Sequence, residues 1–155
     1  MKIPVYEPLF QGNEKRYLNE AISSGWISSD GYFVQKFEEE FAKWSRNKYA
    51  IAVCNGTAAL ETAMWATKLK FIVIPDYTII SCVLAALRAG VVWDYFDYTF
   101  SPKKTRHNLL RCHLFGKLDN LYTDSYCVDD LSQYWQPFKV KDVACYSLYA
   151  NKLIT

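Results

Sequence analysis

Short apolar runs alternate with helical stretches along most of the 155-residue chain. The apolar runs are four to six residues long and rich in Val, Ile, Leu, Tyr and Cys, and they lie at 49–54, 71–74, 91–96, 109–114, 125–128 and 143–148. Residues 57–67 and 79–89 favour helices, and Gly90 is placed to end the second one. Buried strands separated by helices are typical of a parallel sheet covered on both faces. The pattern therefore predicts an α/β fold with three α/β/α layers and a mostly parallel central sheet.

The first part of the chain has a helical pattern without strands. Residues 13–23 favour a helix with Asn13 as a possible N-cap and Gly25 just past its end. A second helix carries an apolar stripe at intervals of three and four residues, formed by Phe33, Phe37, Phe41 and Trp44. We interpret this stripe as part of a core.

Composition excludes several classes of protein. The formal net charge of +2 and the short basic cluster of Lys103, Lys104 and Arg106, interpreted as a solvated loop, argue against a nucleic-acid partner. The best apolar run, residues 79–87, is too short to span a bilayer, and the first residues do not resemble a signal peptide. We therefore expect a cytoplasmic protein without a membrane partner.

The five cysteines are widely spaced and form no CxxC pair or Cys/His cluster with metal-ligand spacing. We expect buried, reduced thiols and no metal site.

Candidate chemistry follows the predicted strands, at the sheet edge where parallel α/β proteins bind ligands. Gly56 and Thr57 form a small-residue turn that opens a helix, a natural seat for a phosphate. Later strands are followed by Tyr77, by the pair Asp129 and Asp130 with Gln133, and by Ser147 and Lys152. Each feature alone has a structural explanation: a helix cap, a packed ring, or a solvated lysine.

The order of these features is more specific than any one of them. A Gly-Thr turn, an aromatic after Pro-Asp, an Asp-x-x-Gln and a Ser-x-Tyr-x-Asn-Lys occur in succession. The chain resembles the DegT/DnrJ/StrS family of pyridoxal-phosphate-dependent sugar aminotransferases, which have the aspartate-aminotransferase-like fold. Residues 24–29, 113–116 and 145–152 match further stretches of that family.

The resemblance implies a role for each residue of the candidate site. Lys152 would form an imine with the aldehyde of pyridoxal 5'-phosphate and later move the proton. Asp130 would face the pyridine nitrogen and keep it protonated. The cofactor phosphate would be held by Gly56, Thr57 and Ser147. Tyr77 would stack on the cofactor ring, and Gln133 would lie near its phenolic oxygen. For His113 a structural hydrogen bond is expected, whereas Trp26, Ser28 and Ser29 would lie near the mouth of the site.

The resemblance also implies a reaction. Some relatives carry histidine in place of the lysine and deoxygenate the sugar, so Lys152 favours transamination. The expected acceptor is a nucleotide-linked keto sugar and the expected donor is glutamate. The expected assembly is a homodimer or a complex with a complementing chain.

Relatives continue beyond the position of Thr155 into a second domain. We therefore expect residues 1–155 to be a single cofactor-binding large domain that includes the helical segment 1–46, incomplete in its sheet and without the C-terminal small domain. Two alternatives remain open: a non-catalytic remnant that binds the cofactor or a full-length relative, and an unrelated nucleotide-binding module. The second lacks support because no GxGxxG or Walker-type loop is present.

Overall fold

The computed structural model describes residues 3–4, 7, 9–97 and 104–152. The chain folds into two compact units. The first comprises Met1–Ala52 with Pro137–Lys139, and the second comprises Val53–Gln136 with Val140–Thr155. All seven predicted cofactor-binding residues belong to the second unit.

The first unit contains the two predicted helices, α1 (Glu14–Ser24) and α2 (Tyr32–Ser45). Gly25 ends α1 in the left-handed region at φ 73°, as expected for a residue just past the helix. Asn13 occupies the N-cap position, but its side chain makes no capping hydrogen bond. On α2 the rings of Phe37, Phe41 and Trp44 lie in contact, with successive centroids 5.3 and 5.2 Å apart.

The prediction of a strand at residues 49–54 is wrong. The segment forms no ladder with any described strand, and Tyr49 and Ile51 are 74% and 77% exposed. The backbone N–H of Ala52 instead donates to the Glu38 carboxylate at 2.8 Å. An apolar alternating run becomes a strand only where a neighbouring strand accepts its backbone hydrogen bonds, and none of the described strands does so.

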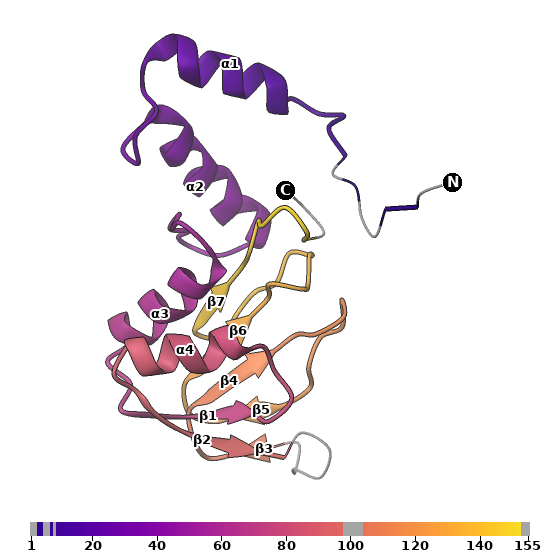
Figure 1. The fold of residues 1–155 in the computed structure, drawn as a ribbon. Helices are drawn as coiled ribbons and strands as arrows, with labels where there is room; N and C mark the ends of the chain where they lie inside the picture. The colour runs from indigo at the N-terminus through magenta and orange to yellow at the C-terminus, as the bar shows by residue number, and fades with distance from the viewer. Residues whose placement is uncertain (1–2, 5–6, 8, 98–103, 153–155) are drawn as a thin grey trace. The chain divides into compact units, whose positions relative to one another are not determined.

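The second unit is built on a five-stranded sheet with the order β2-β1-β4-β6-β7, in which every pairing is parallel (Figure 1). Its strands are β1 (Phe71–Pro75), β2 (Val92–Phe96), β4 (Leu109–Cys112), β6 (Cys127–Asp130) and β7 (Val143–Cys145). Each coincides with a predicted apolar run to within a few residues at its ends. The predicted α/β fold with a parallel sheet is confirmed.

Helices α3 (Gly56–Ala66) and α4 (Ile80–Arg88) lie side by side on one face of this sheet (Figure 1). The core between them and the sheet is apolar and fully buried, and it includes Leu60, Met64, Ile72, Ile74 and Leu110. Burying a side chain of this size stabilises the fold by about 1.5–3 kcal/mol. This core fixes the N-terminus of α3 relative to the strands.

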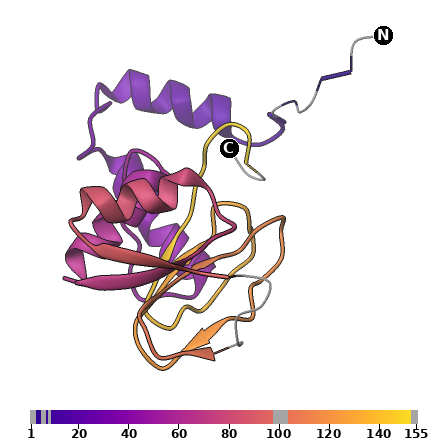
Figure 2. The same cartoon turned by 60° about the horizontal axis from the view of Figure 1, so that its bottom comes forward.

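The face away from α3 and α4 carries a smaller cluster of Val73, Leu109 and Cys127. A second, two-stranded sheet lies on that side, formed by β3 (Lys104–Thr105) and β5 (Tyr122–Thr123) (Figure 2). Lys104 pairs with Asp124 at 2.7 Å and remains exposed, so it is solvated as expected, but it lies in a strand and not in a loop. Lys103 lies outside the described residues. Two-residue strands are too short for an apolar period to reveal them.

Strand β6 extends to Asp130, two residues beyond the predicted end at Val128. Because successive side chains of a strand point to opposite faces, Asp129 and Asp130 have different surroundings. Both carboxylates are buried, at 0% and 6% exposure, so each requires hydrogen-bonding partners.

In the part of the chain that the structure describes, no helix combines the length and the apolar character needed to cross a membrane.

Candidate functional site

The N-terminus of α3 lies close to two serine side chains. Asn55 caps the helix by accepting the Ala58 N–H on its side-chain oxygen at 2.9 Å. A Cβ atom on Gly56 would lie 3.0 Å from Cβ of Ser147 and 3.3 Å from Oγ of Ser132. Glycine is therefore required by space, and the fold brings two serine hydroxyls to the first turn of a helix. Such a turn presents N–H groups without a partner in the helix and favours an anion.

Asp130 ends β6 at the same edge of the sheet, paired with Cys145 of β7. One carboxylate oxygen, Oδ1, accepts the Ser132 N–H at 2.9 Å. The other, Oδ2, lies 3.4 Å from Sγ of Cys82. The contacts of its two carboxylate oxygens with Ser132 and Cys82 thus hold the Asp130 side chain in one orientation.

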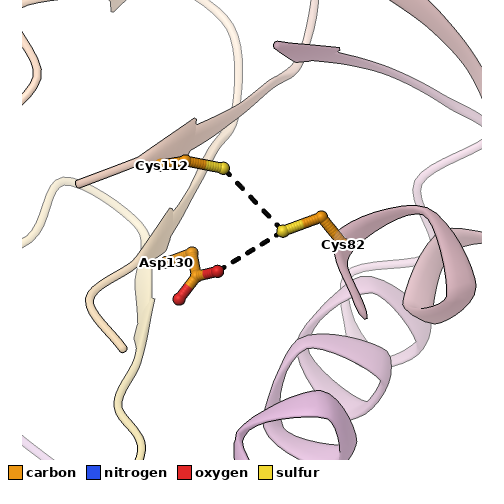
Figure 3. A group of neighbouring side chains, drawn as sticks. All are labelled: Cys82, Cys112 and Asp130. Carbon is orange, nitrogen blue, oxygen red and sulfur yellow. Dashed lines mark hydrogen bonds between the residues drawn. The ribbon is translucent and has the colours of Figure 1, made fainter. Parts of the chain in front are cut away.

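Two cysteines and a threonine surround this carboxylate. Cys82 from α4 and Cys112 from β4 have their sulfur atoms 3.8 Å apart, beside Asp130 (Figure 3). The Thr78 hydroxyl lies 3.0 Å from Sγ of Cys112 and 3.3 Å from Sγ of Cys82. The hydrogen bond with Cys82, together with burial, raises the pKa of the Cys112 thiol well above its ordinary value. Cys112 is therefore a protonated thiol at neutral pH.

Asp129 forms a separate buried cluster. Its Oδ1 accepts hydrogen bonds from Nε of Arg111 at 2.6 Å and from Nε2 of His113 at 2.9 Å. Burial opposes the charged form, but the hydrogen bonds from His113 and Arg111 outweigh it, and the pKa of the Asp129 carboxyl lies below its ordinary value.

His113 is engaged at both ring nitrogens. Nδ1 accepts the Asp119 N–H at 2.9 Å, which leaves the proton on Nε2 to be donated to Asp129. The residue is 1% exposed. This arrangement agrees with the structural role expected for His113.

Gln133 holds the turn that follows β4. Its Oε1 accepts the Phe115 N–H at 3.0 Å, and its backbone carbonyl accepts the Gly116 N–H at 3.0 Å. The ring of Phe115 lies 6.3 Å from that of Tyr77, which is 58% exposed after β1. The Nε2 amide of Gln133 remains as the group that can approach a ligand.

Lys152 lies in the turn that follows β7. Its backbone N–H donates to the carbonyl of Tyr149 at 2.7 Å, and its side chain is half-buried. The preceding Ser147 accepts the Tyr149 N–H on its hydroxyl at 3.4 Å. The turn thus carries both a predicted phosphate ligand and the predicted reactive amine.

The structure therefore brings Gly56 and Ser147 together, with Thr57 next in the same helical turn. It places Tyr77, Gln133 and Lys152 after strands, as expected, whereas Asp130 is the last residue of β6. Sequence analysis missed Ser132 as a neighbour of Gly56, the Asp129 cluster, and the contacts of Cys82 with Asp130 and with Cys112. The two cysteines are separated by 29 residues, so only the topology of the sheet joins them.

A sequence model of one known family, described as the DegT/DnrJ/EryC1/StrS aminotransferase family, matches residues 8–102. The chain belongs to this family. The resemblance drawn from the sequence motifs is thereby confirmed.

Full-length relatives show the same relationship. GDP-perosamine synthases of Vibrio cholerae and of Escherichia coli O157:H7 are each 31% identical over 99% of this chain and 50% of their own length. The structure of a putative sugar aminotransferase from Streptococcus pneumoniae in its PMP-form superimposes with a TM-score of 0.83 at 17% identity, over 100% of this chain and 50% of that one. The chain spans about half the length of the curated relatives that it matches, and its fold is that of sugar aminotransferases.

Proposed function

We propose that the second compact unit of the chain binds pyridoxal 5'-phosphate, with the phosphate at the N-terminus of α3. The observation that carries the proposal is the close approach of Ser147 and Ser132 to Gly56, which leaves no room for a Cβ atom there and brings two hydroxyls to the first turn of α3. The backbone N–H groups of Gly56 and Thr57 and the hydroxyls of Thr57 and Ser147 are donors suited to a dianion. The residues present therefore fit the cofactor.

Asp130 is the proposed partner of the ring nitrogen. Its carboxylate is buried and oriented by the Ser132 N–H, so it can keep a proton on that nitrogen. Tyr77 supplies an exposed ring for stacking, and the Nε2 amide of Gln133 is the proposed donor to the phenolic oxygen. Bound in this way, the cofactor supplies an electron sink for the carbon that loses its proton.

Lys152 is the proposed catalytic residue. Its Nζ would hold the cofactor aldehyde in the resting protein. Once the amino donor has displaced it, the same amine would carry the proton between the donor carbon and the cofactor. Lys152 lies in a turn seven residues after the end of β7, which its backbone N–H closes on the Tyr149 carbonyl.

We propose that the reaction is transfer of an amino group, with glutamate as donor and a nucleotide-linked keto sugar as acceptor. The names of the relatives support a nucleotide sugar as substrate, since GDP-perosamine synthases match over almost the whole of this chain. The lysine at position 152 supports transamination.

A partner chain is part of the proposal. Among the described strands, β7 pairs only with β6, so one of its edges carries backbone groups available to another strand. We propose that a second copy of this chain or a complementing polypeptide completes the assembly.

Turnover tests the proposal. Protein loaded with the cofactor should convert glutamate to 2-oxoglutarate and aminate a nucleotide-linked keto sugar, both detected by mass spectrometry. Cofactor binding without either product would favour the non-catalytic remnant.

A further inference from the structure

The cluster around Asp130 has the composition of a soft-metal site. Cys82, Cys112 and Asp130 each offer one ligand atom, and these atoms all lie within 4.8 Å of one another. All three side chains are buried, and they come from α4, β4 and β6 (Figure 3). Thiolate with carboxylate is a ligand set that Zn²⁺ takes in proteins.

The spacing of the ligand atoms matches tetrahedral zinc. With Zn–S bonds of about 2.3 Å and Zn–O bonds of about 2.0 Å, a tetrahedral ion holds two sulfurs roughly 3.8 Å apart and sulfur from oxygen roughly 3.5 Å. Here Sγ of Cys82 lies 3.8 Å from Sγ of Cys112 and 3.4 Å from Oδ2 of Asp130. Both separations that involve Cys82 therefore match tetrahedral zinc, and the third, between Cys112 and Asp130, is no more than 4.8 Å.

The surroundings supply a second layer of contacts. The Thr78 hydroxyl lies within 3.3 Å of both sulfurs and can donate a hydrogen bond to a thiolate. Oδ1 of Asp130 is held by the Ser132 N–H, and Oδ2 is directed at Sγ of Cys82. Outer partners of this kind orient metal ligands and raise their affinity.

We propose that Cys82, Cys112 and Asp130 form a binding site for Zn²⁺. On binding, each thiol loses its S–H proton to the buffer as a sulfur–zinc bond forms, and the carboxylate contributes an oxygen lone pair. No electron is transferred. The fourth position is filled by water.

Zinc at this site would interfere with cofactor binding, a consequence that rests on the proposed function. Zinc on Oδ2 engages the carboxylate assigned to the ring nitrogen, so zinc and pyridoxal phosphate would antagonise one another. The metal site itself is independent of the cofactor, and its test requires no cofactor.

Cobalt is the probe. Reduced, cofactor-free protein titrated with Co²⁺ should develop the thiolate-to-cobalt charge-transfer absorbance at one equivalent, and Zn²⁺ should displace it. Cys82→Ser and Cys112→Ser should each weaken binding by at least about tenfold, the lower range seen even for outer-shell changes. Cys127→Ser and Cys54→Ser are the matched controls and should titrate like the wild type, because neither residue belongs to the cluster.

A measurement on the unaltered protein covers the case in which the ligand variants do not fold. X-ray absorption of the zinc-loaded wild type should show two sulfur neighbours at about 2.3 Å with oxygen completing the shell. Absence of the cobalt band, a shell without sulfur, or a band that survives in both folded ligand variants would each overturn the proposal.

Discussion

Gly56 and Ser147 stand so close that a Cβ atom on the glycine would lie 3.0 Å from Cβ of the serine. The two residues are far apart in sequence, at the start of α3 and just after β7. Their proximity is the point at which the helix and the last described strand converge on one candidate phosphate site.

Gly56→Ala should weaken binding of pyridoxal phosphate. The added methyl must displace Ser147, and loss of about one charge-assisted hydrogen bond corresponds to roughly a ten- to hundredfold weaker affinity. Titration followed by cofactor absorbance measures the change. Gly12→Ala is the matched control, because its Cβ would meet only the Glu14 carboxylate, the far end of a flexible side chain. Equal affinities for the two variants would contradict the assignment.

The two asparagines at helix starts should differ in their contribution to stability. Asn55 accepts the Ala58 N–H, so Asn55→Ala should lower the free energy of unfolding by about 0.5–2 kcal/mol. Asn13 makes no such bond, and Asn13→Ala should change it little. Urea denaturation of both variants provides the comparison, and a larger loss at Asn13 would run against the structure.

Asp129→Asn should destabilise the protein at neutral pH. The carboxylate is fully buried against Arg111, and removing one partner of a buried ion pair costs about 3–5 kcal/mol. Because the folded-state pKa of Asp129 is lowered, its contribution to stability is present above the ordinary carboxyl pKa of about 4 and is lost as pH falls through the folded value.

The difference in unfolding free energy between wild type and Asp129→Asn should therefore shrink as pH falls below about 4. Denaturant titrations at a series of pH values measure it. Asp124→Asn serves as the control, because the Lys104–Asp124 pair is exposed and should alter stability little at any pH. A difference in unfolding free energy between wild type and Asp129→Asn that stays constant with pH would be inconsistent with the lowered pKa.

Local patterns predicted most of the elements. Helix α2, the Gly25 end of α1 and the buried runs of β1 and β6 all depend on residues close in sequence, which is why they could be anticipated. The stripe of α2 was expected in a core, but none of its four aromatic residues is buried. Residues 49–54 have the same kind of pattern as β1 but form no strand. A strand forms only where a second strand accepts its backbone hydrogen bonds, and the apolar pattern of one segment does not show whether such a partner is present.

Contacts between distant segments were not predictable in the same way. Nothing in the spacing of Cys82 and Cys112 indicates that their sulfurs meet beside Asp130, because α4, β4 and β6 become neighbours only through the strand order. Arg111 and His113 reach Asp129 because alternate residues of adjacent strands share a face. The residues of the proposed cofactor site were named from motif order, and the structure adds their surroundings.

The most direct test concerns Lys152. Wild-type protein mixed with pyridoxal phosphate should gain the visible absorbance band that the cofactor acquires when a lysine amine binds its aldehyde. Lys152→Ala should lack the band, whereas the matched Lys117→Ala, altered at an exposed turn, should retain it. A wild type without the band at saturating cofactor, or an undiminished band in Lys152→Ala, would contradict the account.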